Sequence, residues 1–394
     1  MRSILLVLAS IALTGLSWGV YGPVLHWGQG DMSTIGEYAR LRPFVCVGFA
    51  YFIIGVLVPS GLLKARGEAG EWTARGSTLS FLAGALGAVG ALGIIMAFTF
   101  GGRPVFVMPL VFGGAPVVNS FITIYWAKKF KEIGPVFIAG LIMVLMGAVT
   151  VLSFAPRPAK ADAKPPAAEA EAAAAATDEA NAEANGDIEQ AVEEEAGFFS
   201  RFVLQIASIA LVVCCWGAYG PVLHKGQAAM KQSRLRPLIC VGLAYFAIAV
   251  IVPNIVLPVV PEASVYNFSG TIWSLAAGSA GAIGALGIIM AFAFGGKPVY
   301  VMPLVFGAAP VINTLFTTFT RGLWSEVSAL FLAGLMLVVA GAALVLVFAP
   351  KGAPPKKPEG ESELQKEAEP PVEPAGENQT DASVDKPHSA DDGN

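Results

Sequence analysis

Six aromatic and amide side chains lie in apolar surroundings, where they could bind a small molecule. They are Trp18, Tyr21, Asn119, Trp216, Tyr219 and Asn313. Aromatic rings offer flat apolar faces, whereas amides donate and accept hydrogen bonds. A site of this composition without fixed charge suits a small, polar, uncharged metabolite such as a sugar-like solute. No nucleophile stands beside a recognisable base, so the sequence predicts binding and no enzymatic activity.

A second interpretation of these side chains stays open. Tryptophan and tyrosine also anchor membrane helices at the interface, so Tyr21 and Tyr219 fit an interfacial belt as well as a cavity. An amide inside a membrane helix needs a partner, which is either another helix or a ligand. His26 and His224 favour the interface, because a glutamine and a polar loop follow each of them.

The six residues form pairs because the chain contains an internal repeat. Residues 83–119 recur as residues 277–313, and 29 of these 37 positions are identical. The two copies extend roughly over residues 4–155 and 202–349. Self-similarity of this extent indicates that one structural unit occurs twice.

The composition indicates that this unit lies in a membrane. The chain is 55% hydrophobic, and charge is nearly absent from long blocks. Each copy has five apolar blocks, each long enough to cross a hydrocarbon core of roughly 30 Å as a helix. In the first copy they cover residues 4–24, 43–63, 79–100, 104–126 and 134–154. The predicted fold is therefore an all-α integral membrane protein with ten transmembrane helices.

An odd number of helices per copy places the second copy upside down, which gives two inverted five-helix repeats. Lysine and arginine collect in short cytoplasmic loops. The loop after the second helix carries Lys64, Arg66 and Arg75, whereas the turn at residues 261–264 in the second copy has no base. The charges predict that both termini are cytoplasmic and the linker is outside, in a cytoplasmic (inner) or plasma membrane. Inverted repeats are common in secondary transporters.

Short motifs follow the same order in both copies. Trp-Gly closes the first helix, Leu-Arg opens the second, and a proline lies inside the fourth, at Pro116 and Pro310. This order resembles the drug/metabolite transporter superfamily, of the EamA type. The resemblance implies five plus five helices, cytoplasmic termini and transport. One departure concerns Glu132 and Glu326, which lie in the turn after the fourth helix, whereas many relatives have a glutamate that closes this helix.

Two further patterns concern helix geometry. The first helix of each copy ends in Gly-Pro, at residues 22–23 and 220–221, which predicts a kink or a break. The third helix carries a glycine at every third position, starting at Gly84 and Gly278. That spacing predicts close contact between helices, a seam that moves during transport, or both.

The chain divides into four predicted segments. They are residues 1–156 for the first repeat, 157–198 for an acidic Ala/Glu-rich linker, 199–350 for the second repeat and 351–394 for a disordered Pro/Glu/Lys-rich tail. Four cysteines in apolar helices and three histidines predict neither a cofactor nor a metal site. The near-neutral charge argues against nucleic acid as a partner. The expected partners are a small-molecule substrate and the lipid bilayer.

These observations together predict a secondary transporter that works by alternating access. The alternative is a non-transporting membrane scaffold or sensor, which keeps the fold and binds partners through its linker or tail. No Asp or Glu occurs within a predicted span, which weakens the case for proton coupling through a buried carboxylate.

Overall fold

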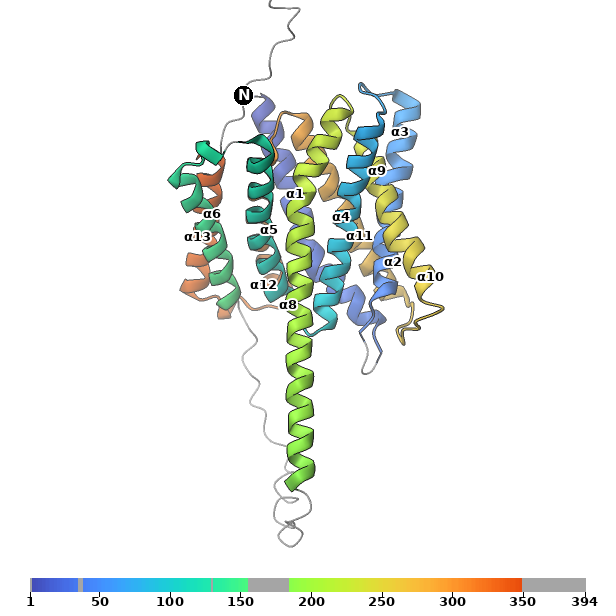
Figure 1. The fold of residues 1–394 in the computed structure, drawn as a ribbon, viewed down its shortest axis with the longest axis vertical. Coiled ribbons are helices and arrows are strands. Elements are labelled where there is room, and N and C mark those ends of the chain that lie inside the picture. Colours follow the sequence, from blue (N-terminus) through green and yellow to red (C-terminus); the bar gives the residue numbers. More distant parts are fainter. Residues whose placement is uncertain (1, 35–37, 129, 155–183, 349–394) are drawn as a thin grey trace, which may run out of the picture. The chain divides into compact units, whose positions relative to one another are not determined.

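The computed structural model describes residues 2–34, 38–128, 130–154 and 184–348. These residues are largely helical and include no strand (Figure 1). Eight helical segments among them are long and apolar enough to cross a membrane. The chain is therefore an all-α, multi-pass membrane protein. Most of the predicted linker and the whole predicted tail lie outside the described residues.

All five apolar blocks predicted for the first copy form helices. The elements are α1 (Arg2–Met32), α2 (Leu41–Phe52), the π-helix η1 (Ile53–Leu57), α3 (Val58–Arg66), α4 (Ala74–Thr99), α5 (Pro104–Ala127), the 3-10 helix η2 (Phe130–Glu132) and α6 (Pro135–Ser153). The α2, η1 and α3 segments follow one another without interruption and form one span.

The second copy repeats this order of elements. They are α8 (Ala184–Ala229), α9 (Leu235–Tyr245), the π-helix η3 (Phe246–Ile251), α10 (Val252–Val256), α11 (Phe268–Ala293), α12 (Pro298–Thr320), the 3-10 helix η4 (Trp324–Glu326) and α13 (Ala329–Phe348). The fifth helices, α6 and α13, contain shorter apolar stretches, Pro135–Val151 and Ala329–Gly341. These two helices pack against each other.

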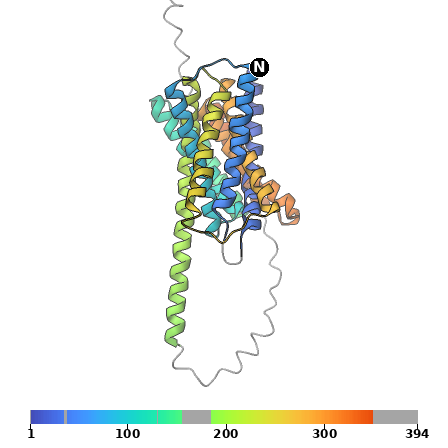
Figure 2. The ribbon, with the colours of Figure 1, turned by 90° about the vertical axis from the view of Figure 1, so that its right-hand side faces the viewer.

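The helices of the two copies interleave. Helix α1 of the first copy packs chiefly against α11 and α12 of the second, whereas α8 of the second packs against α4 and α5 of the first (Figures 1 and 2). Each contact therefore has a counterpart in which the roles of the copies are exchanged. The core consequently forms between the copies, and neither copy buries its apolar faces alone.

The glycines at every third position bring helices of different copies into close contact. A Cβ atom added to Gly84 in α4 would lie 2.7 Å from the Cα of Val241 in α9. The equivalent Gly278 in α11 faces the Cα of Val47 in α2 at the same 2.7 Å. The nearest atom opposite each glycine belongs to the backbone of the other helix, so no change of a side-chain rotamer would make room for a Cβ atom. This is the close packing that glycine permits in membrane helices.

The Gly-Pro pairs were predicted to cause a kink or a break, and the prediction of a break is wrong. Helix α1 continues through Pro23 to Met32, and α8 continues through Pro221 to Ala229. The glycine before each proline serves packing, because a Cβ atom on Gly22 would lie 2.6 Å from the Cγ of Met108. The residues that directly follow each histidine, up to Met32 and Ala229, are therefore helical.

A carboxylate of the second copy caps a helix of the first. Glu262, in the loop after α10, accepts hydrogen bonds from the backbone N–H groups of Leu41 at 3.0 Å and Arg42 at 3.3 Å, at the start of α2. It also forms an ion pair with the Arg42 guanidinium at 3.6 Å. The first N–H groups of a helix have no partner within the helix and attract negative charge. The loop thereby holds the start of α2.

A glutamate of the first copy caps a helix of the second in the same way. Glu68 lies 194 residues before Glu262, at the equivalent position of the repeat. Its carboxylate accepts hydrogen bonds from the N–H groups of Arg234 at 2.8 Å and Leu235 at 3.1 Å, at the start of α9. The two copies thus cap each other's second helix through matched glutamates.

Candidate functional site

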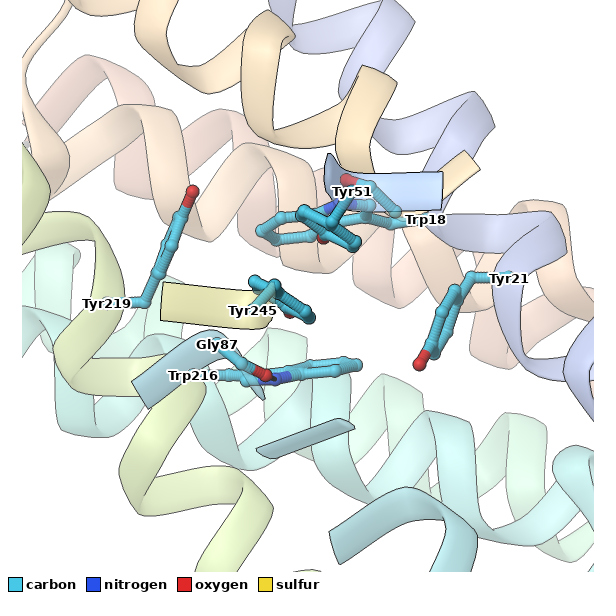
Figure 3. A pocket seen from close by; sticks show the side chains of 8 residues that line it. Trp18, Tyr21, Tyr51, Gly87, Trp216, Tyr219 and Tyr245 are labelled. Carbon is cyan, nitrogen blue, oxygen red and sulfur yellow. Dashed lines mark hydrogen bonds between the residues drawn. The ribbon is translucent and has the colours of Figure 1, made fainter. Parts of the chain in front are cut away.

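A pocket lies between the two copies. Its lining is almost entirely aromatic (Figure 3). The residues that line it are Trp18, Tyr21, Tyr51, Gly87, Trp216, Tyr219, Tyr245 and Gly281. Each copy contributes one Trp, two Tyr and one Gly at equivalent positions. None of the eight residues carries a charge, so the lining itself has no fixed counter-ion.

The two tryptophans are held in place by the opposite copy. The indole N–H of Trp18 donates to the carbonyl oxygen of Gly281 at 3.2 Å, and that of Trp216 donates to Gly87 at 3.3 Å. The ring centroids lie 6.0 Å apart with an interplanar angle of 27°. With their N–H groups engaged in these bonds, the indoles offer mainly their faces to a ligand.

Two tyrosines stack face to face in the centre of the site. The rings of Tyr51 in α2 and Tyr245 in α9 have centroids 3.5 Å apart and are parallel within 2°. In the view of Figure 3 the Tyr51 ring overlaps that of Trp18, and the Tyr245 ring lies between Trp18 and Trp216. Tyr51 and Tyr245 occupy equivalent positions of the repeat, so the stack is a point where matching parts of the two copies meet.

The remaining two tyrosines carry buried hydroxyls. Tyr21 and Tyr219 are 4% and 3% exposed. Among the described residues neither hydroxyl has a hydrogen-bond partner. A buried polar group without a partner is unfavourable, and native proteins keep few of them. These two hydroxyls are therefore the polar groups of the pocket that a ligand would engage.

A second layer of rings supports the tryptophans. Phe306 in α12 packs on Trp18 with centroids 5.9 Å apart, and Phe112 in α5 packs on Trp216 at 6.0 Å. The two phenylalanines contact each other at 6.0 Å. Both are fully buried. Aromatic contacts of this kind fix ring orientation in addition to burying apolar area.

The structure brings four of the six predicted site residues together and places the two asparagines elsewhere. Asn119 and Asn313 are fully buried but do not line this pocket. The side-chain amide of Asn119 in α5 donates to the carbonyl oxygen of Pro298, the first residue of α12, at 3.0 Å. For Asn119 this is the helix-to-helix bond that the sequence left open as one of two alternatives, whereas the amide of Asn313 has no hydrogen-bond partner among the described residues.

The glutamine that follows each histidine is also buried. Gln29 donates to the hydroxyl of Thr99 at 3.2 Å, and Gln227 donates to the carbonyl oxygen of Ile289 at 3.0 Å. His26 packs edge-on against Phe98 with centroids 5.3 Å apart. These side chains bind α1 to α4 and α8 to α11, and none of them lines the pocket.

Tyr51 and Tyr245 were absent from the predicted site. A signal for them exists in the sequence, because they are the same residue at equivalent positions of the repeat, inside apolar spans. Nothing in the sequence shows that the two rings meet, however, since that contact depends on how the copies are paired in space.

No protein-family model and no curated protein matches the chain. A solved structure described only as "Crystal structure of protein" has a similar fold, with a TM-score of 0.52 and 16% sequence identity. The similarity covers 86% of this chain and 98% of that chain. At this identity the likeness concerns the fold alone, and it extends over nearly the whole of the other chain.

Proposed function

We propose that the chain is a secondary transporter that moves a small, polar, uncharged metabolite by alternating access. The observation that carries the proposal is the aromatic pocket, to which each copy contributes the same four positions. Transporters built from inverted repeats bind substrate near the bilayer midplane, at the interface of the repeats.

The proposal includes an architecture. Ten transmembrane helices form two inverted five-helix repeats, related by a pseudo-two-fold axis in the membrane plane, as the resemblance to the EamA-type drug/metabolite transporters suggests. Both termini are cytoplasmic, the linker is outside, and the membrane is the cytoplasmic (inner) or plasma membrane. The exchange of roles between α1–α11 and α8–α4 supports this symmetry. No catalytic step is proposed, because the lining is restricted to Trp, Tyr and Gly.

A non-transporting scaffold or sensor is the competing function. A scaffold needs no pocket between its repeats and gains nothing from buried hydroxyls without partners. The hydroxyls of Tyr21 and Tyr219 therefore favour transport, since a substrate would supply the missing hydrogen bonds.

Thermal stabilisation of the purified protein tests the proposal. A ligand that binds only the folded state stabilises it by about 2.7 kcal/mol at 100 times its Kd. We expect at least one uncharged metabolite of a screened library to raise the melting temperature and to be taken up by proteoliposomes. Joint replacement Trp18→Ala and Trp216→Ala should abolish both effects. The control is Trp72→Ala, because Trp72 is half-exposed in a loop outside the pocket. A library without any stabilising or transported member would leave the scaffold as the better account.

The inverted topology is testable with a matched pair of cysteines. Ala69 and Ala263 occupy equivalent positions of the repeat and are both exposed. In a protein whose native cysteines are replaced, Ala69→Cys should react with an impermeant maleimide only from the cytoplasmic side. Ala263→Cys should react only from the outside. Labelling of both from the same side would show that the copies are not inverted.

A further inference from the structure

We propose that the pocket selects flat, uncharged ring compounds that enter between Tyr51 and Tyr245 and bond the hydroxyls of Tyr21 and Tyr219. This inference rests on the proposed function and deepens it by naming the substrate class. It also replaces the expectation of a sugar-like solute, which depended on amides in the cavity.

The central stack is the geometric basis of this inference. The Tyr51 and Tyr245 rings lie parallel and in direct contact at 3.5 Å, so a flat ring can enter between them only if the two tyrosines separate. A third ring inserted between them needs a contact distance on each face, which increases their separation to about 7 Å. The inserted ring then takes over the stacking that each tyrosine loses, whereas a puckered ring cannot.

The helices that carry the two tyrosines are irregular directly beyond them. The π-helix η1 begins at Ile53, two residues after Tyr51, and η3 begins at Phe246, next to Tyr245. π-Helical turns are rare and occur often at functional sites. Both tyrosines thus stand beside a turn whose hydrogen bonds differ from those of the rest of the span, which is where a change in ring separation can be absorbed.

The hydroxyls of Tyr21 and Tyr219 determine which polar groups a bound ligand ring must carry at its edges. Each phenol hydroxyl both donates and accepts a hydrogen bond. In Figure 3, Tyr21 and Tyr219 lie on opposite sides of the central stack. A ring with a polar group at each of two edges therefore satisfies both hydroxyls. The indole N–H groups are already bonded to glycine carbonyls and add no further polar contact.

The polar groups of the pocket lining disfavour two other classes of ligand. A sugar carries a hydroxyl on almost every ring carbon, and two tyrosine hydroxyls would leave most of these groups without partners. An organic cation would find aromatic faces but no carboxylate among the lining residues. A charge without a counter-ion is expensive to bury in a membrane protein.

Two matched pairs of compounds test the inference on the purified full chain. Hydroquinone and trans-1,4-cyclohexanediol share two hydroxyls at opposite edges, but only the former is flat. Uracil and 5,6-dihydrouracil differ in the same way. We expect the flat member of at least one pair to bind about tenfold more tightly than its saturated partner, a difference of about 1.4 kcal/mol. Calorimetry or thermal stabilisation measures this. Glucose and tetramethylammonium serve as probes for the two disfavoured classes.

Variants connect the preference to the named side chains. Tyr21→Phe and Tyr219→Phe keep the rings and remove the hydroxyls, so each should weaken binding of the flat probe by about tenfold. Tyr51→Leu should abolish the preference for the flat member. Tyr266→Phe is the control, because Tyr266 is 52% exposed and outside the pocket. The melting temperature of each unliganded variant shows that it folds.

Several outcomes would overturn the inference. They are equal binding of flat and saturated partners, no binding of either flat probe at millimolar concentration, and tighter binding of glucose or tetramethylammonium. The failure of transport is a separate result. Flat probes that bind but are not carried into proteoliposomes would refute the proposed function and support the binding class, whereas transport of glucose without binding of flat rings would do the reverse.

Discussion

Replacement of Glu262 by alanine is expected to lower the free energy of unfolding by about 1–3 kcal/mol, because the N–H groups at the start of α2 lose the carboxylate that accepts their hydrogen bonds. The Glu262 side chain is 2% exposed. It binds the N-terminus of α2 from a loop of the other copy. The variant should therefore loosen the contact between copies as well as the helix end.

The stabilisation that Glu262 provides should decrease at acidic pH. Burial raises the pKa of Glu262, but hydrogen bonds from the Ser264 hydroxyl and the backbone N–H groups at the start of α2 outweigh burial and lower it below 4.5. A carboxyl group with a lowered pKa in the folded state stabilises that state above its ordinary pKa. The stabilisation is lost as the pH falls through the folded pKa. Acid should thus destabilise the wild type more than Glu262→Ala.

An exposed glutamate in the equivalent loop of the first copy provides the control. Glu71 forms an ion pair with Lys231 at 3.0 Å, and the two side chains are 53% and 68% exposed. Exposed pairs contribute about 0–1 kcal/mol, so Glu71→Ala should have little effect. Unfolding followed by tryptophan fluorescence in detergent measures both variants between pH 3 and about 7. Equal stabilities of the two variants would show that the cap between the copies adds nothing.

The membrane helices could be predicted from the sequence because a span is a local property. Length and apolar content place each helix, and the five blocks of the first copy match the helices found. The ends were less certain, as the continuation of α1 to Met32 shows. Proline removes one N–H group, but its effect on the helix depends on neighbours such as Met108, which the local sequence does not reveal.

Only the pocket residues that stand beside the repeated Trp-Gly motif could be predicted from the sequence. Trp18 and Tyr21 stand beside the same motif as Trp216 and Tyr219, and both pairs reach the pocket. Burial of a polar group, in contrast, does not reveal its partner. The amide of Asn119 bonds the carbonyl oxygen of Pro298, which lies 179 residues away in the chain. The stacked tyrosines were missed for the same reason, because their contact arises only when the copies pair.

The prediction that links packing most directly to binding concerns Gly90 and Gly284. A Cβ atom on Gly90 would lie 2.2 Å from the indole nitrogen of Trp216, and one on Gly284 would lie 2.2 Å from that of Trp18. Ordinary contacts need about 3.5 Å, so each ring would have to move by more than about 1 Å. Such a shift breaks its hydrogen bond to a glycine carbonyl and moves the indole within the pocket.

We expect Gly90→Ala and Gly284→Ala each to reduce ligand binding and uptake by at least about tenfold, with a loss of stability of about 1–3 kcal/mol from overpacking. The control is Gly61→Ala, because a Cβ atom there has no neighbour within 4 Å. Alanine favours a helix over glycine by up to about 1 kcal/mol, so this control should be neutral or stabilising. The two pocket variants occupy equivalent positions and face equivalent rings, so their losses should be similar. Normal uptake by either one would show that the position of its tryptophan does not govern binding.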